Sequence, residues 1–251
     1  MSRGTAARAL LAAFGALALV HLGALLFGAG TVEVVIKPAL MPVLAAYVRV
    51  RGGPLLLVAA LLFGCGGDTL LQAGGDTAFL VGMASFAAGH LCYLALFVRR
   101  GATPRWGRRW RLAAVAAGYT AAWLGTVALL WPDLPAALRG PVAGYSLLLT
   151  AMAYGALRAG PRALLGGLCF LGSDTLIATG IAHWPQPPAP QFCIMLGYLA
   201  AQWLLADGVL RTTGPPASGT GGPPGRRDPA ATGPGTDGQR CSTASSASTI
   251  P

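Results

Sequence analysis

The chain carries eight segments of about 20 mostly apolar residues each, and this pattern limits its fold more than any other feature. A helix of that length crosses the hydrocarbon core of a bilayer, where only helices and closed barrels satisfy all of their backbone hydrogen bonds. Apolar residues make up 54% of the chain and charged residues only 10%, whereas soluble domains carry about 25% charged residues. We therefore expect an all-α fold, a polytopic transmembrane helix bundle. The expected spans are approximately 9–29, 32–48, 54–72, 78–98, 112–131, 136–157, 163–182 and 191–210.

The basic residues predict the orientation of this bundle. With the N-terminus on the cytoplasmic side, almost all arginines fall in the two terminal segments and in the even-numbered loops. The odd-numbered loops and the span ends beside them hold Glu33, Asp76, Asp133 and only one arginine, Arg139. Because Lys and Arg concentrate in cytoplasmic loops, we expect both termini inside. The first span could instead be a signal peptide, but its apolar run of roughly 20 residues exceeds the usual h-region of about 7–15.

The net charge of +10 follows from these flanking arginines, which suit contacts with anionic lipid headgroups. No aromatic-interleaved basic module accompanies them, so we expect the lipid bilayer as a partner and no nucleic acid. The expected location is that of an integral multi-pass membrane protein. The membrane would be the cell membrane if the source is bacterial and the endoplasmic reticulum membrane if it is eukaryotic. The sequence leaves the oligomeric state open.

Two domains of different composition are expected. Residues 1–211 form the transmembrane helical domain, and residues 212–251 form a cytoplasmic tail rich in Gly, Pro, Ser and Thr. Such a tail cannot bury enough apolar surface to offset its ordering entropy, so we expect it to be disordered. The five cysteines show no C-x-x-C and no Cys/His ligand spacing. We therefore expect no disulfide framework, no metal site and no cofactor.

Two similar short motifs place an aspartate inside an apolar span. A carboxylate inside a bilayer costs on the order of 3 kcal/mol or more unless it is paired or hydrated, so two of them indicate a shared polar site between helices. The third and seventh spans that carry them run in the same direction, which is consistent with a parallel 4+4 repeat. The motifs are Cys65-Gly66-Gly67-Asp68-Thr69-Leu70 and Leu171-Gly172-Ser173-Asp174-Thr175-Leu176.

The fourth span adds a face of aromatic and polar side chains. Residues at steps of three and four share one side of a helix. The phenylalanines of this face are typical of a packing stripe. A histidine at mid-span, however, needs a polar partner, for which Asp68 and Asp174 are candidates. The six residues of the face are Phe79, Gly82, Phe86, His90, Tyr93 and Phe97.

Other polar residues fall in the second and eighth spans. Tyr198 and Gln202 lie four residues apart, which suits either an interhelical hydrogen bond or the lining of a site. Lys37 is followed by Pro38 and could either snorkel outward or line a polar cavity. Both aspartates and the lysine fall toward the outer half of their spans, with His90 somewhat deeper. The sequence therefore predicts a polar chamber in the outer half of the bundle.

The order and spacing of these residues resemble the lysoplasmalogenase (YhhN-like) family of integral membrane proteins. The resemblance extends over about residues 30–210. A serine often found just before the first Gly-Asp of the family is absent here. The blocks that carry the likeness are Lys37-Pro38 with Met41-Pro42, Gly67-Asp68, Phe79-x2-Gly82-x3-Phe86-x3-His90-x2-Tyr93, Ser173-Asp174 and Tyr198-x3-Gln202.

The resemblance implies a membrane hydrolase that cleaves the vinyl ether bond of a 1-alkenyl lysophospholipid, giving a fatty aldehyde and a glycerophospho-alcohol. Proton delivery to the alkenyl carbon would give an oxocarbenium ion, which a carboxylate can stabilise, as in glycosidases. Asp68 and Asp174 would share the acid and stabiliser roles, and His90 would tune or shuttle protons. Tyr93, Tyr198 and Gln202 would orient substrate or water. Lys37 would hold the phosphate or pair with a carboxylate.

Two other classes fit the same intramembrane polar residues. A proton-coupled small-molecule or lipid transporter also uses carboxylates and histidines within its spans. A noncatalytic lipid-binding or scaffold protein would use the aspartates as structural contacts alone. The family resemblance favours the enzyme.

Overall fold

The computed structural model describes residues 2–100 and 109–213, and every regular element in these ranges is helical. Each of the eight α-helices is long and apolar enough to cross a membrane, so the predicted all-α bundle of about eight spans is confirmed for the described residues. The tail predicted to be disordered comprises residues 212–251, and from residue 214 on it lies outside the described ranges. The elements are α1 (Arg3–Phe27), α2 (Gly30–Val50), α3 (Leu55–Ala73), α4 (Asp76–Arg100), α5 (Arg109–Leu130), α6 (Ala136–Ala156), the short 3-10 helix η2 (Leu157–Ala159), α7 (Pro161–Ile181) and α8 (Pro190–Thr213).

Helix boundaries follow from local chemistry. Ser2 caps α1, because its hydroxyl accepts a hydrogen bond from the Thr5 amide at 3.2 Å. Gly28 ends the same helix with φ of 70°, a conformation that suits a glycine because it lacks a Cβ. The last helix continues to Thr213, past the domain boundary expected at residue 211.

The two prolines inside α2 do not end that helix. Pro42 has no amide hydrogen, so the carbonyl of Pro38, one turn earlier, lacks its usual intrahelical donor. The Cys65 thiol of α3 donates to this carbonyl at 3.2 Å. A neighbouring helix thus satisfies the backbone group that the proline leaves free, which is how spanning helices tolerate proline.

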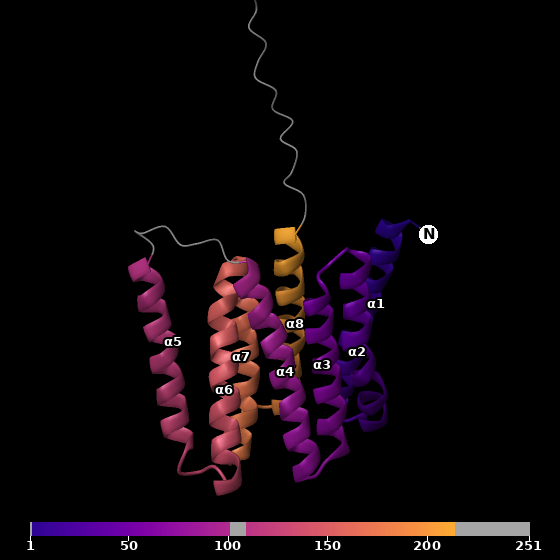
Figure 1. Ribbon diagram of the computed structural model, residues 1–251. Helices are drawn as coiled ribbons and strands as arrows, with labels where there is room; N and C mark the ends of the chain where they lie inside the picture. Colours follow the sequence, from indigo (N-terminus) through magenta and orange to yellow (C-terminus); the bar gives the residue numbers. More distant parts are fainter. Residues whose placement is uncertain (1, 101–108, 214–251) are drawn as a thin grey trace, which may run out of the picture. The chain divides into compact units, whose positions relative to one another are not determined.

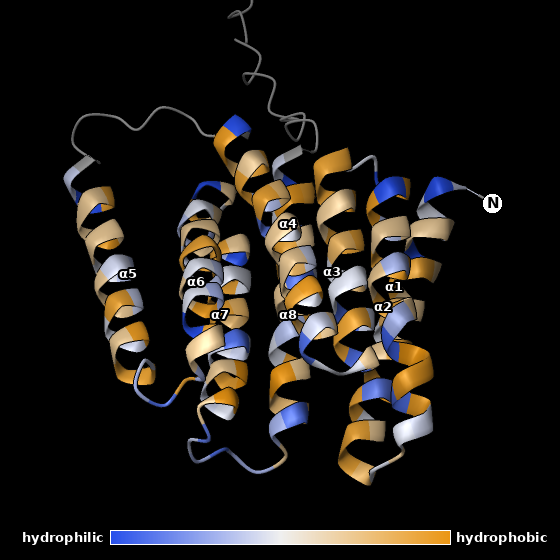
Figure 2. Cartoon of the chain, turned by 60° about the horizontal axis from the view of Figure 1, so that its bottom comes forward, coloured by the Kyte–Doolittle hydropathy of each residue, from blue (hydrophilic) through white to orange (hydrophobic). Residues whose placement is uncertain are grey.

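The helices pack in an order that differs from their order in the chain. α2 and α4 both pack on α3, α4 packs on α6, α6 on α7, and α7 on α8, while α8 returns to α1 and α2. These contacts close a ring of seven helices. α5 lies outside this ring and packs mainly on α6, and both views show it at one edge (Figures 1 and 2).

Glycines allow the closest helix pairs to approach. A Cβ added at Gly208 of α8 would lie 2.8 Å from the backbone nitrogen of Ala163 in α7. A Cβ at Gly166 would lie 2.9 Å from the backbone nitrogen of Leu205. Small residues at such crossings are the usual basis of helix association in membranes, where lipid provides no hydrophobic drive.

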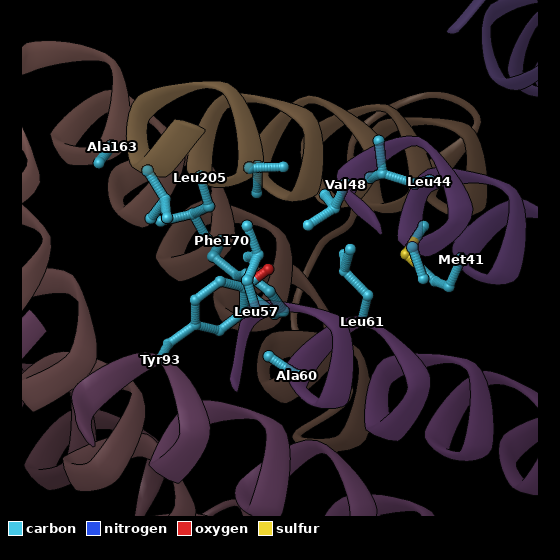
Figure 3. Packing of buried hydrophobic residues seen from close by; sticks show 14 of the residues in the cluster. Met41, Leu44, Val48, Leu57, Ala60, Leu61, Tyr93, Ala163, Phe170 and Leu205 are labelled. Carbon is cyan, nitrogen blue, oxygen red and sulfur yellow. The ribbon is translucent and has the colours of Figure 1, made fainter. Parts of the chain in front are cut away.

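A large part of the apolar core lies where α2, α3, α7 and α8 meet. Leu44, Leu57, Leu61, Phe170 and Leu205 are almost fully buried in this cluster (Figure 3). The outer faces of the helices are largely apolar as well, as Figure 2 shows by colour, and suit contact with lipid. Polar side chains of α3, α4, α7 and α8 lie next to this apolar cluster.

α5 makes only shallow contacts. Its described side chains are exposed except for one face with half-buried residues at helical spacing and the buried Leu130 at its end. That face includes Tyr119, Trp123 and Val127, which line the main cavity of the protein. α5 therefore forms one wall of the cavity.

Candidate functional site

A cavity of about 990 Å³ occupies the half of the bundle opposite the N-terminus. Its lining starts at the helix ends, with Glu33 of α2 and Gln72 of α3, and continues inward to the two intramembrane aspartates. The predicted polar chamber thus corresponds to a real cavity, and both Asp68 and Asp174 line it together with Lys37. A space of this size falls at the upper end of the range for small-molecule sites.

Asp68 connects three helices. It lies on α3 with only 3% of its surface exposed. Its Oδ1 lies 3.7 Å from Nζ of Lys37 on α2, and its Oδ2 accepts a hydrogen bond of 2.8 Å from the Tyr198 hydroxyl on α8. Of the two roles expected for Lys37, the structure shows the pairing with a carboxylate.

Asp174 has a different set of partners. The Tyr145 hydroxyl of α6 donates to its Oδ2 at 2.5 Å. His90 of α4 reaches the same hydroxyl, with Nε2 3.0 Å from the Tyr145 oxygen. The histidine therefore meets an aspartate only through Tyr145, whereas the sequence suggested Asp68 or Asp174 as its direct partner.

The direction of the hydrogen bonds among His90, Tyr145 and Asp174 determines which of their atoms carry protons. Because the Tyr145 proton points to Asp174, the tyrosine oxygen accepts, and Nε2–H of His90 donates to it. Nδ1 of His90 is buried without a hydrogen-bond partner among the described residues. The ring packs edge-on against Phe170, with centroids 4.7 Å apart. His90, Tyr145 and Asp174 thus form a continuous line of hydrogen bonds that ends at the cavity.

Tyr93 and Gln202 lie behind the cavity wall. The Tyr93 hydroxyl donates to Oε1 of Gln202 at 2.7 Å, and both side chains are almost fully buried. Neither lines the main cavity; both border a small void beside His90 and Gly64. Their expected role in orienting substrate or water stays a prediction. Gln202 also forms a side-chain hydrogen bond with Tyr198.

Glycines in the first motif make room for the polar layer. A Cβ at Gly64 would lie 2.9 Å from the Tyr198 hydroxyl, and one at Gly67 would lie 2.5 Å from the ring of Phe86. Phe86 in turn packs edge-on against Tyr198, with centroids 6.0 Å apart. The face of α4 predicted from its spacing thus contributes Phe86 to the cavity and His90 to the layer beneath it.

The two aspartate motifs are used in parallel ways. Each aspartate is met by a side chain of the preceding even-numbered helix, Lys37 of α2 for Asp68 and Tyr145 of α6 for Asp174. In both motifs the following threonine donates to the carbonyl four residues earlier. Tyr145 was not among the predicted site residues, but the spacing offers one signal for it: it precedes Asp174 by 29 residues, nearly as Lys37 precedes Asp68.

The donor set of the cavity is that of acid–base chemistry. Within residues 2–100 and 109–213, no three His, Cys, Asp or Glu side chains group closely enough to hold a metal ion. The described cavity lining instead holds three carboxylates, three phenols and two basic side chains: Glu33, Asp68, Asp174, Tyr119, Tyr145, Tyr198, Lys37 and Arg139. Such a set can donate and accept protons and can stabilise a positive charge that develops nearby.

Comparison with known proteins identifies the family of this chain. The sequence profile of the YhhN family matches residues 32–209. The chain belongs to the YhhN family. All of the predicted site residues, and Tyr145, lie within the matched region, whereas α1 precedes it. The resemblance inferred from the sequence motifs is therefore confirmed, and the protein is a multi-pass membrane protein.

Several relatives share this family region. The human protein named Lysoplasmalogenase TMEM86B is 36% identical over 160 residues, which cover 64% of this chain and 66% of the human protein. The Sus scrofa protein of the same name is 36% identical over 175 residues, 67% of this chain and 72% of that protein. A Mycobacterium bovis protein named Lysoplasmalogenase is 37% identical over 131 residues, 49% of each chain. No solved structure matches the chain.

Proposed function

We propose that this YhhN family protein is a lysoplasmalogenase, a hydrolase of the vinyl ether bond in 1-alkenyl lysophospholipids. The main support is one observation: two intramembrane aspartates with different partners line a single cavity in an apolar bundle. The names of the human, porcine and mycobacterial relatives support the same substrate class. The match covers just under two thirds of the human protein, so the activity remains our proposal for this chain.

The partners assign the two carboxyl groups to different roles. Lys37 compensates the negative charge of an ionised Asp68, and Tyr198 donates a further hydrogen bond to it. Among the described residues, Asp174 has only the neutral Tyr145 as a hydrogen-bond partner, so this apolar setting accommodates its neutral acid form. We assign proton donation to Asp174 and stabilisation of the cation to Asp68.

These roles give a balanced reaction. The proton of Asp174 adds to the alkenyl carbon farther from oxygen, and the adjacent carbon becomes an oxocarbenium ion. Asp68 stabilises this ion electrostatically. Water adds to the cationic carbon and loses a proton to the Asp174 carboxylate, which restores the acid. The hemiacetal then breaks its bond to the glycerol oxygen, which takes a proton from the Asp174 carboxyl group. The hemiacetal hydroxyl gives its proton back to Asp174, and the aldehyde and the glycerophospho-alcohol are released.

The remaining polar residues would act through Asp68 and Asp174. Tyr145 and His90 hold the Asp174 carboxyl group and offer a path for its proton. Tyr93 and Gln202 are positioning residues for Tyr198 rather than substrate ligands. The bilayer would deliver the substrate, in the cell membrane of a bacterium or the endoplasmic reticulum membrane of a eukaryote.

The test is aldehyde release from a 1-alkenyl lysophospholipid by detergent-purified protein. We expect release by the wild type and its loss in Asp68→Asn and Asp174→Asn variants that remain folded. Asp76→Asn is the matched control, because Gly74-Gly75-Asp76-Thr77 repeats the sequence around Asp68 at an exposed position outside the cavity. Lipid flux in liposomes without product, or near-normal turnover in both asparagine variants, would contradict the proposal.

A further inference from the structure

The substrate proposed above carries a phosphate, and the lysine expected to receive it is already engaged. Lys37 lies 3.7 Å from Asp68, which is buried, so moving the lysine to a phosphate would leave a carboxylate unpaired in the membrane. The phosphate therefore requires another cation. Among the described residues that line the cavity, the only other basic side chain is Arg139.

Arg139 is held in place by the segment that joins α5 and α6. Its Nε donates to the carbonyl of Leu134 at 3.1 Å, and its Nη2 donates to the carbonyl of Pro132 at 3.3 Å. The guanidinium group also lies over the Trp131 ring, 5.8 Å from its centroid. These contacts fix the group at the cavity mouth and leave part of its donor fork unused.

Arg139 has no ion-pair partner among the described residues. Within the part of the chain that the structure describes, no carboxylate lies within ion-pair distance of it, whereas Arg162 and Arg211 both pair with Asp207. Arg139 is also the arginine that departs from the predicted charge bias of the loops, so membrane orientation gives no reason for it. An arginine with an unmatched charge and a fixed orientation suits a bidentate contact with an anion.

The distance to the reacting centre suits the glycerol backbone of the substrate. Arg139 and Tyr145 both belong to α6 and line the same cavity. Six residues of helix separate them by about 9 Å along the axis. Tyr145 contacts the proposed proton donor, Asp174. A glycerol unit that joins phosphate and vinyl ether spans a separation of this order.

We propose that Arg139 binds the substrate phosphate at the cavity mouth and thereby sets the vinyl ether at the depth of the two aspartates. The inference rests on the function proposed above. It makes Arg139 the residue that selects phosphorylated ether lipids over phosphate-free ones. The 1-alkenyl glycerol formed by removing the phosphate would reach the same aspartates without this anchor.

The experiment compares these two substrates in purified variants. In Arg139→Gln we expect KM for the 1-alkenyl lysophospholipid to rise about 10- to 100-fold with kcat nearly unchanged, as for loss of a charged hydrogen bond. Turnover of the 1-alkenyl glycerol should not change. Arg139→Lys should recover part of the preference, because lysine keeps the charge without the fork. Arg158→Gln, an exposed arginine that does not line the cavity, is the matched control.

A binding measurement separates this inference from the proposed function. An uncleavable 1-alkyl lysophospholipid should raise the melting temperature of the wild type and Arg158→Gln more than the matching 1-alkyl glycerol does. Arg139→Gln should respond equally to both. If the melting temperatures follow this pattern but no aldehyde is released, the proposed reaction is overturned and the phosphate site is retained. An unchanged preference in Arg139→Gln, or an equal loss for both lipids, would overturn the site and assign Arg139 to the loop or to bilayer headgroups.

Discussion

The Tyr145 hydroxyl lies 2.5 Å from Oδ2 of Asp174, and it shares its oxygen with His90 on a third helix. This contact gives Asp174 a neutral partner, whereas Asp68 has the cationic Lys37. The two carboxyl groups of one cavity are thus placed in unlike surroundings, which is the arrangement that acid catalysis with charge stabilisation requires.

Exchanging the carboxyl groups for amides should separate their roles. Asp174→Asn removes the proton donor and should lower kcat by about 10²- to 10⁴-fold with little change in stability. Asp68→Asn also leaves Lys37 unpaired in the bundle, which should cost about 3–5 kcal/mol of unfolding free energy. Adding Lys37→Met to Asp68→Asn should restore the stability but not the turnover. Rates of aldehyde release and thermal unfolding in detergent measure the turnover and the stability. Restored turnover in the double variant would argue against a role for the Asp68 charge.

Removing the Tyr145 hydroxyl tests the line from His90 to Asp174. Tyr145→Phe should lower kcat about 10- to 100-fold and leave KM nearly unchanged, because the tyrosine acts on the carboxyl group. Tyr154→Phe is the control on the same helix, since its hydroxyl donates to the Leu112 carbonyl outside the cavity at 3.2 Å. Equal effects of the two changes on kcat would show that Tyr145 contributes to packing only.

A methyl group at Gly67 should disturb the cavity wall. Because the added Cβ would lie 2.5 Å from the Phe86 ring, we expect Gly67→Ala to destabilise the protein by about 1–3 kcal/mol. Gly118→Ala on α5 has no heavy atom within 4 Å and should be neutral or slightly stabilising. Thermal unfolding of both variants provides the comparison. Phe86→Leu should recover stability in the Gly67→Ala background, and failure to do so would place the strain elsewhere.

Labelling from one side of the membrane tests the predicted orientation. In a cysteine-free background with Cys65 as serine, which keeps a donor for Pro38, single cysteines at Asp133 and Arg158 mark opposite ends of the bundle. An impermeant maleimide should label Asp133→Cys in intact cells and Arg158→Cys only after permeabilisation. The reverse pattern would place the cavity mouth on the cytoplasmic side.

The sequence predicted the eight spans and the presence of a polar chamber better than it predicted the neighbours of each helix. Long apolar runs mark spans regardless of context, and an aspartate in such a run has few stable surroundings, so both features are readable from the chain. The position of α5 cannot be read from the sequence, because a helix that is apolar on most faces can contact either lipid or protein. Its sequence neighbours α4 and α6 pack on each other, and α5 lies outside them.

The hydrogen-bond partners of the polar site residues were also hard to predict, because they too depend on how the helices are placed relative to one another. Spacing placed His90 and Tyr93 on one face of α4, but it could not show that Tyr145 separates His90 from Asp174. It also could not show that Tyr93 and Gln202 satisfy each other behind the cavity. Hydrogen-bond partners between helices depend on rotation and depth of each helix, and neither follows from hydropathy.

The pairing of each aspartate with the helix before it has a consequence for biosynthesis. Lys37 is made before Asp68, and Tyr145 is made before Asp174, whereas Tyr198 follows Asp68 by 130 residues. When α3 or α7 leaves the ribosome, a polar partner for its carboxyl group is already in the nascent chain. Each aspartate can therefore enter the bilayer together with a preceding helix as an antiparallel hairpin. The late contact from α8 would then complete the site only after the last span has been inserted.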